Sequence, residues 1–160
     1  MGLSYPPISA CGAHAALPHY IPTKKTDMPL STTEVYLIDS GGQYLDGTID
    51  TTRTVYFGEP SQELMDAFTR VLKGSIFLRT AAFPRKSVGS VLDTLARKYL
   101  WDAHLNYGHG TGHGIGSFLG VHEGPFSIGY KTGWDDPGLE ENMFTTNGSK
   151  PSQSFQIDRR

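Results

Sequence analysis

The amino-acid sequence predicts an α+β fold in which a β-hairpin precedes two amphipathic helices. Three features predict it: β-branched and aromatic runs over residues 35–57, helical periodicities over 61–76 and 87–104, and a glycine- and histidine-rich segment over 107–125. The chain has 160 residues, of which 38% are hydrophobic and 19% are charged. This length and composition fit one globular domain.

The first 33 residues are predicted to be loop, because residues 2–33 are rich in Pro, Ser and Thr and show no sustained period. A short strand is expected over 17–20. The hairpin follows, with a first strand that ends at Asp39 and a second over 49–57. The pair Asp46-Gly47 is its strongest turn signal.

Two helices are expected after the hairpin. Ser61 is a suitable N-cap for the first, and Glu63 falls in its first turn. The second covers about 87–104 and has the cleanest period in the sequence. Both apolar stripes are predicted to face the core; they comprise Leu64, Phe68, Val71, Leu72 and Ile76 in the first helix and Val88, Val91, Leu92, Leu95, Ala96, Tyr99 and Leu100 in the second.

The charge balance favours a peptide or small molecule as the ligand. A net charge of -2 gives no electrostatic reason to expect nucleic acid or an anionic membrane as a partner. The single cysteine, Cys11, indicates a reducing compartment and is interpreted as a buried or incidental thiol. No apolar run approaches the roughly 20 residues that cross a bilayer, so the chain is expected to be cytoplasmic.

Three histidines, His109, His113 and His122, lie within fourteen residues on a glycine-rich backbone. Glycine is used where the chain approaches something closely or takes unusual dihedral angles, and it costs stability there. A ligand or metal site is therefore expected in this segment.

Two hairpin carboxylates, Asp39 and Asp50, are predicted to share one face of the hairpin. If Asp46-Gly47 is the centre of a two-residue turn, Asp50 pairs with Gln43, about four residues or roughly 13 Å from Asp39. Joint metal binding then requires a register shift, which a bulge or wide loop at Gly41-Gly42 would supply.

Metal binding is the chemistry that these residues support best. Apolar residues precede both aspartates, so both are expected to be partly buried, where like charges repel unless a cation or proton intervenes. Neutral imidazole from His113 with carboxylates suits Mn, Zn, Co or Fe. The glycines do not complete a dinucleotide-binding fingerprint, no serine has the spacing of a nucleophile elbow, and Gly124-Pro125 would break a zincin helix after His122.

Four motifs resemble the Xaa-Pro aminopeptidases of the creatinase, prolidase and methionine aminopeptidase superfamily. They are Asp39-Ser-Gly-Gly-Gln-Tyr44, Asp46-Gly-Thr-Ile-Asp50-Thr-Thr-Arg53-Thr54, His109-Gly-Thr-Gly-His113-Gly-Ile-Gly and Val121-His122-Glu123-Gly-Pro125. The resemblance implies a partial pita-bread fold, a curved antiparallel sheet with flanking helices whose last strands are missing. It runs to about Thr146 and implies that family members carry further segments on both sides.

The resemblance also implies a role for each histidine and aspartate of the site. It assigns Asp39, Asp50 and His113 as metal ligands, His109 and His122 as catalytic and substrate-binding residues, and His19 as substrate-binding. The implied cofactor is a divalent metal, manganese before others, with two ions in the intact family site. The implied substrates are peptides with proline in the second position.

The sequence departs from the family pattern after Thr146, because two glutamate ligands, one of them in a Thr-x-Glu-Pro-Gly motif, are absent. Residues 1–146 are therefore interpreted as a partial metallopeptidase domain and 147–160 as a disordered tail outside the family. We expect at most one weakly held metal and impaired activity. The alternatives are a non-catalytic remnant that binds peptides, forms a homodimer or pairs with a full-length subunit, and an unstable product without a role.

Overall fold

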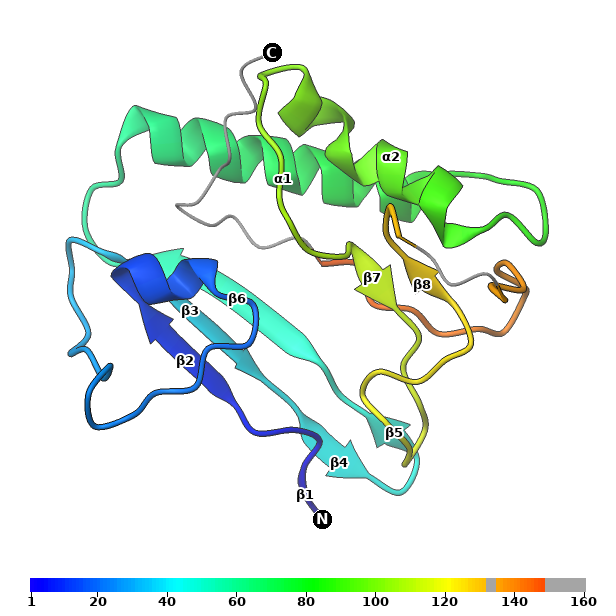
Figure 1. Ribbon diagram of the computed structural model, residues 1–160, viewed down its shortest axis with the longest axis horizontal. Coiled ribbons are helices and arrows are strands. Elements are labelled where there is room, and N and C mark those ends of the chain that lie inside the picture. The colour runs from blue at the N-terminus through cyan, green and yellow to red at the C-terminus, as the bar shows by residue number, and fades with distance from the viewer. Residues whose placement is uncertain (132–134, 149–160) are drawn as a thin grey trace.

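The computed structural model describes residues 1–131 and 135–148 and has the predicted mixture of helices and antiparallel strands. Figure 1 shows the two helices side by side, with the strands of the hairpin below them and a short ribbon between. The long helices are α1 (Gln62–Thr80) and α2 (Gly89–Trp101), and the ribbon comprises β7 (Gly112–His113) and β8 (Ser127–Ile128).

Two three-stranded antiparallel sheets contain the hairpin. The first has the order β2-β3-β6 and the second the order β1-β4-β5. In the first, side chains of β3 alternate between buried and less buried, so Val35, Leu37 and Asp39 share the buried face. The strands are β1 (Gly2–Leu3), β2 (Ile8–Cys11), β3 (Val35–Ser40), β4 (Gly42–Tyr44), β5 (Gly47–Thr48) and β6 (Thr51–Tyr56).

The prediction for the first 33 residues is partly wrong, because β1, β2 and a 3-10 helix form within the expected loop. No strand forms over 17–20; instead, β2 pairs with β3, and a 3-10 helix, η1 (Gly12–Ala16), follows it. The sequence of β2 offers only four residues of alternation after two prolines, too short a signal to separate from loop. Burial of Ile8, Ala10 and Cys11 against the sheet stabilises the strand.

The predicted hairpin turn is displaced by one residue. Tyr44 pairs with Gly47, so Leu45 and Asp46 form the turn. The same register continues through the pair Asp39 and Thr52, which places Asp50 opposite Gly41 instead of Gln43. The two aspartates are therefore offset by two residues, roughly 7 Å along the strands, and no bulge at Gly41-Gly42 is needed.

The irregularity lies in the neighbouring strand instead. Four residues separate Leu3 of β1 from Ile8 of β2, whereas only two separate their pairing partners, Gly42 of β4 and Asp39 of β3. These two extra residues form a bulge that contains Tyr5. The structure thus moves the expected bulge from the hairpin to the strand beside it.

Both predicted helices form. Ser61 caps α1, because its Oγ accepts a hydrogen bond from the Leu64 backbone N–H at 3.3 Å. The helices pack closely at Gly74, where a Cβ atom would overlap the carbonyl oxygen of Ala96. Leu92, Ala96 and Leu100 of α2 are buried as predicted, whereas Val91 is exposed.

The predicted core stripe of the first helix is only partly buried. Val71 is buried, but Phe68, Leu72 and Ile76 are exposed. The buried face consists of Ala67, Val71, Gly74 and Leu78, because Gly74 sets the line of contact with α2. Four exposed apolar residues form what we call the α1 apolar stripe, which comprises Met65, Phe68, Leu72 and Ile76, with exposures between 42% and 52%.

The chain around the start of the predicted tail lies beside the ribbon. Thr146 donates its backbone N–H to the His113 carbonyl, and Gly148 donates to the Thr111 carbonyl, both at 2.9 Å. Most of the tail, residues 149–160, lies outside the described residues, so its predicted disorder stays a prediction. In the described part of the chain, neither helix is long and apolar enough to span a bilayer.

Replacement of Gly74 by alanine tests the helix contact. In an exposed helix this change stabilises by about 1 kcal/mol. Here we expect it to destabilise by about 1–3 kcal/mol, because the methyl group would overlap the Ala96 carbonyl. Urea unfolding measures the difference. Gly47→Ala is the matched control, since a Cβ there meets no atom within 4 Å; equal effects of the two changes would contradict the described packing.

Candidate metal centre

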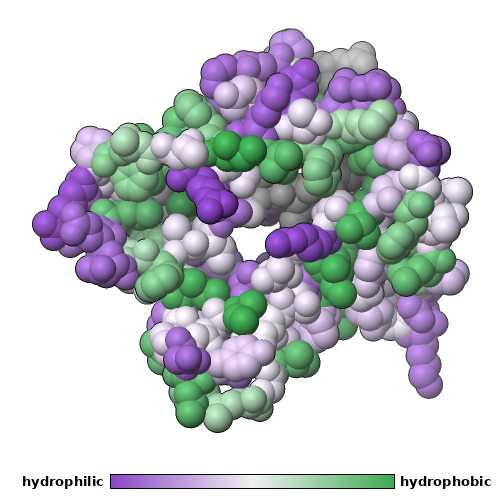
Figure 2. Space-filling model, turned by 180° about the vertical axis from the view of Figure 1, so that it is seen from behind, coloured by the Kyte–Doolittle hydropathy of each residue, from purple (hydrophilic) through white to green (hydrophobic). Residues whose placement is uncertain are grey.

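All six predicted site residues line one cleft of about 1280 Å³. The cleft lies between β6, α1 and the ribbon, and Figure 2 shows the molecule hollowed at its centre. Three of the six come from the hairpin and the ribbon, and three from connecting segments; they are His19, Asp39, Asp50, His109, His113 and His122. A cleft of this size, lined by apolar and titratable groups, is typical of a ligand-binding site.

The two aspartates meet at the hydroxyl group of Tyr5. Its oxygen donates to Asp39 Oδ1 at 2.6 Å and lies 3.1 Å from Asp50 Oδ1. Asp39 is buried and Asp50 is half-buried, as predicted from the apolar residues before them. Burial, the hydrogen bond to Asp39 and the negative charges of both aspartates raise the pKa of Tyr5 far above its usual value, so the phenol keeps its proton.

His113 faces Asp50 from the ribbon. Its Nδ1 lies 2.9 Å from the Gly114 carbonyl, which can only accept a hydrogen bond, so Nδ1 carries the proton. Nε2 then points to Asp50 Oδ2 at 3.2 Å. Burial lowers the pKa of His113, but hydrogen bonds to Asp50 and to the Gly114 carbonyl outweigh it, and the net pKa is raised.

The main chain of His113 is held on both sides. The residue pairs with Ser127 of β8, and its carbonyl accepts the Thr146 N–H. Gly112 and Gly114 flank it, and a Cβ at either would overlap a carbonyl oxygen, that of Thr146 or of Glu123. The glycines of this motif therefore allow neighbouring backbone to approach the strand that carries the imidazole.

Asp50, His113 and His122 form a group that fits a metal ion. Each offers one ligand atom, and these atoms lie within 4.8 Å of one another. Carboxylate and imidazole together suit a divalent ion of the first transition series. Asp39 is outside this group and is connected to Asp50 through the Tyr5 hydroxyl. The group thus contains two of the three predicted ligands, Asp50 and His113, together with His122.

His122 and His19 complete the open side of the cleft. The ring of His122 meets that of His113 edge to face, with 4.1 Å between centroids, and lies 6.3 Å from that of His19. Burial, and the nearby positive charge of His113 when protonated, lower the pKa of His122. His122 therefore stays neutral near pH 7 and can accept or donate a hydrogen bond.

His109 lies in the segment between α2 and the ribbon. Its Nδ1 lies 2.7 Å from the Gly110 carbonyl and so carries the proton. Its ring stacks on that of Tyr107 with 4.7 Å between centroids. The imidazole thus has a defined tautomer and a fixed packing partner.

Tyr5 is the site residue that sequence reasoning missed. It is separated from the two aspartates by 34 and 45 positions and lies in a proline-rich stretch without a period. The sequence signal available was the aromatic side chain before Pro6-Pro7, which is also common in loops. Only the strand bulge explains why it points between the carboxylates.

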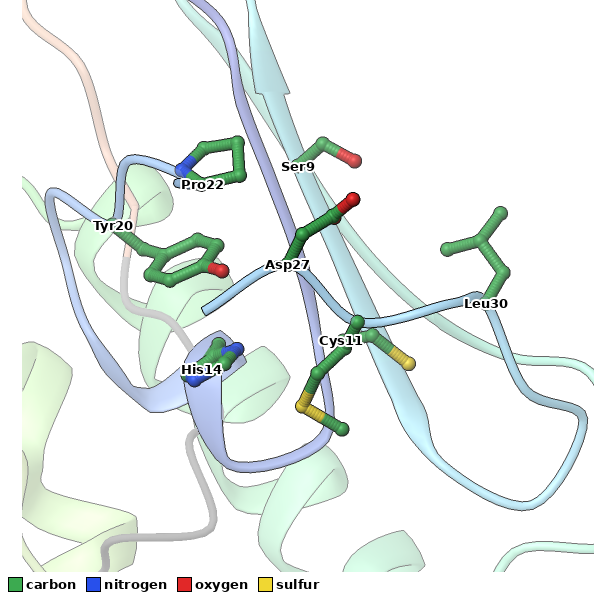
Figure 3. Close-up of a pocket in the computed structure, with 8 residues that line it drawn as sticks. Ser9, Cys11, His14, Tyr20, Pro22, Asp27 and Leu30 are labelled. Atoms are coloured by element: carbon green, nitrogen blue, oxygen red, sulfur yellow. The ribbon is translucent and has the colours of Figure 1, made fainter. Parts of the chain in front are cut away.

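A second, smaller pocket of about 240 Å³ lies beside η1 and contains none of the predicted site residues. Figure 3 shows the rings of His14 and Tyr20 stacked within it, close to Cys11. Cys11 is a free cysteine with 4% exposure, which agrees with its interpretation as a buried thiol.

Comparison with protein families and characterised relatives gives one consistent result. The family model "Metallopeptidase family M24" matches residues 1–151. The Xaa-Pro aminopeptidase ApepP of Drosophila melanogaster is 56% identical over 147 residues, which are 92% of this chain and 24% of that protein. Human Xaa-Pro aminopeptidase 2 is 52% identical over 145 residues, 91% of this chain and 21% of that protein.

Solved structures give the same relationship. The X-prolyl aminopeptidase of Caenorhabditis elegans, described as a cytosolic enzyme with a di-nuclear active site, superposes with a TM-score of 0.84 at 44% identity, over 94% of this chain and 25% of that one. The X-Pro aminopeptidase of Thermotoga maritima gives 0.73 at 34% identity, over 91% of this chain and 39% of that one. These neighbours have the pita-bread fold, so the predicted partial pita-bread fold is confirmed. The chain spans about a quarter of the length of the animal relatives.

Replacement of Tyr5 by phenylalanine tests the contact between the carboxylates. Loss of a hydrogen bond to a charged group costs about 1–3 kcal/mol, so we expect the free energy of unfolding of the metal-free chain to fall by this amount. Tyr44→Phe, at an exposed tyrosine of the hairpin, should change it little. Equal stability of the Tyr5 variant and the parent would show that the phenol does not bridge the aspartates.

The opposite pKa shifts of His113 and His122 give a test by pH. The pKa of His113 is higher in the folded chain than in the unfolded chain, where it is about 6.5. Protonated His113 therefore stabilises the metal-free fold fully below about pH 6.5, and this contribution is lost as the pH rises through the folded-state pKa. His113→Gln should therefore cost more at about pH 5.5 than at about pH 8.5.

For His122 the sign is reversed, because a lowered pKa favours the neutral form in the folded state. His122→Gln should become relatively stabilising as pH falls. Urea unfolding of both variants at the two pH values measures the difference. The same pH dependence in both variants would contradict the described pair of His113 with Asp50.

Proposed function

Because the chain belongs to metallopeptidase family M24, we propose that it carries part of the catalytic site of an Xaa-Pro aminopeptidase and releases the first residue from peptides with proline second. The observation that carries this proposal is the convergence of Asp50, His113 and His122 in the cleft, beside Asp39. The names of the similar proteins support the same substrate class. That similar protein of Caenorhabditis elegans is cytosolic, which supports the cytoplasm as the proposed location.

The proposed metal ligands are Asp39, Asp50 and His113, and manganese is the proposed ion. The donor set supports such an ion, because the carboxylate of Asp50 lies beside the His113 imidazole and the Tyr5 hydroxyl connects the carboxylate of Asp39 to that of Asp50. The protonated Nδ1 of His113 leaves the Nε2 lone pair for the ion. A bound divalent ion would lower the pKa of a water molecule and polarise the scissile carbonyl group.

The remaining histidines are proposed to bind the peptide and move protons. Neutral His122, whose ring contacts that of His113, would hydrogen-bond the substrate near the scissile bond. His109, protonated at Nδ1, presents a fixed imidazole to the cleft. His19, exposed beside His122, is proposed to contact the substrate at the cleft entrance.

We propose that activity is impaired and that at most one ion binds weakly, because the site offers few ligands. Among residues 1–131 and 135–148, the other nearby glutamates have different partners. Glu123 accepts the Gly120 N–H at 2.8 Å, and Glu140 pairs with Arg85 at 2.7 Å. Neither joins the donor group of Asp50, His113 and His122.

A second candidate function is a non-catalytic domain that binds peptides or pairs with another subunit. The α1 apolar stripe favours it, because Phe68 and Leu72 line the cleft and are exposed. Large exposed apolar patches are typical of interaction surfaces. Such a domain would keep the cleft and lose only the turnover.

Calorimetry with MnCl₂ and a peptidase assay separate these functions. We expect measurable binding of Mn²⁺ to the parent chain and a larger loss in Asp50→Ala than the roughly 10–100-fold that an outer-shell change costs. Asp46→Ala, at the exposed hairpin turn, is the control and should bind as the parent does. Absence of binding to the parent would contradict the proposed metal site.

Release of arginine from Arg-Pro-Pro in the presence of Mn²⁺ measures the activity. Slow release that Asp50→Ala abolishes supports the aminopeptidase. Binding of Mn²⁺ without release rejects catalysis by this chain and favours the peptide-binding alternative, which calorimetry with the same peptide then tests.

A further inference from the structure

Two charged residues of α2, Asp93 and Arg97, are almost completely buried, each with 1% exposure. Their ion pair joins Arg97 Nε to Asp93 Oδ2 at 2.6 Å. Asp and Arg are rarely buried this fully without a partner, and a buried ion pair is often no more stabilising than apolar residues of the same size. The burial of this ion pair therefore needs an explanation other than a contribution to stability.

Arg97 holds the chain that leads to His109. Its Nη1 donates to the Tyr107 carbonyl at 2.6 Å and to Asn106 Oδ1 at 2.9 Å, and its Nη2 donates to the His109 carbonyl at 2.7 Å. The guanidinium also lies over the Tyr107 ring, 3.9 Å from its centroid. The planar guanidinium of Arg97 thus holds the carbonyl groups of Tyr107 and His109 by hydrogen bonds, and it also packs against the Tyr107 ring.

Asp93 holds the other end of the same segment. Its Oδ1 accepts a hydrogen bond from the Thr111 hydroxyl, and Tyr107 OH lies 2.5 Å from that hydroxyl. Thr111 directly precedes β7, which carries His113. Residues 107–111 are therefore attached to one turn of α2 at both ends.

The Tyr107 ring connects these contacts to the cleft. It packs against the Arg97 guanidinium and also stacks with the His109 imidazole. His109, unlike Tyr107, lines the cleft. A shift of the guanidinium would accordingly move both the carbonyl of His109 and the surface on which its ring rests.

We propose that Arg97 is a positioning residue that sets the place and tautomer of His109 in the cleft, with Asp93 orienting the guanidinium. The catalytic importance of this role rests on the proposed function of His109, whereas the positioning itself is a property of the fold. Because β8 and residue 146 hold His113 independently, the effect is centred on His109.

The variant Arg97→Lys separates positioning from stability. Lysine can keep the charge pair with Asp93, but its ammonium group lacks the planar set of donors that reaches both carbonyls. The exposed pair of Lys98 and Asp102 has the same spacing on the same helix, so Lys98→Arg is the matched control. A circular dichroism melt shows whether each variant folds.

The ring nitrogen NMR signals of the six histidines provide the readout. In the parent we expect His109 to have its proton on Nδ1. In folded Arg97→Lys we expect the His109 signals to shift and to report a mixture of tautomers, while those of His14 and His104 stay in place. Lys98→Arg should change none of them.

Two results would overturn the proposal: unchanged His109 signals in folded Arg97→Lys, or an equal shift of all six histidines, which would mean a general structural role. If Arg97→Lys does not fold, Thr111→Val, which removes the hydroxyl contacts to Asp93 and Tyr107 and leaves Arg97 in place, is measured instead with the same two criteria. This readout needs neither metal nor peptide, so it can succeed where the proposed function fails.

If Mn²⁺-dependent release of arginine is observed, a second readout applies. Arg97→Lys should lower kcat about 100-fold, the size of effect expected from a misplaced catalytic group, and leave the Kd for Mn²⁺ unchanged. A parallel loss of Mn²⁺ binding would overturn the assignment to His109, because it would place the effect on the ligands.

Discussion

The repulsion between two carboxylates on one face of the hairpin is the constraint on which the site depends. Asp39 and Asp50 lie two residues apart in register, and both are withdrawn from water to some degree. Like charges in such a position require a donor or a cation. In the described structure, the Tyr5 hydroxyl and the His113 imidazole meet this need. The negative charge of the two carboxylates also explains why a divalent ion would be attracted to this point of the cleft.

The fold meets this constraint by bringing three separate segments to the hairpin. A strand bulge delivers Tyr5, the ribbon delivers His113, and α2 holds the segment before the ribbon through Asp93 and Arg97. Glycine is needed where backbones touch, as at Gly112 and Gly114. The glycine-rich motif is therefore explained mainly by close packing of main chain around one imidazole.

Much of the fold follows from local sequence, whereas the site depends on contacts that local sequence does not contain. The two helices, the strand that ends at Asp39 and the histidine segment were predicted from periodicity and composition. The turn was displaced because Asp46-Gly47 is a local signal, while the register is fixed by pairing along the whole hairpin. Arg97 was missed because helical periodicity assigns a charged residue to solvent, and its partners lie in an aperiodic segment. The α1 apolar stripe shows the opposite error: its apolar spacing predicts burial, but the spacing alone does not show whether another element packs on that face.

Side chains from the hairpin and the ribbon are proposed to converge on one cation. Paramagnetic broadening of NMR signals by small amounts of Mn²⁺ tests it most directly, because the effect falls steeply with distance from the ion. We expect the ring signals of His113 and His122 and the backbone amides of Asp39 and Asp50 to broaden first, while the signals of His14 and His104 remain sharp. Broadening that begins at His14 or His104, or that spares His113, would contradict the proposed convergence.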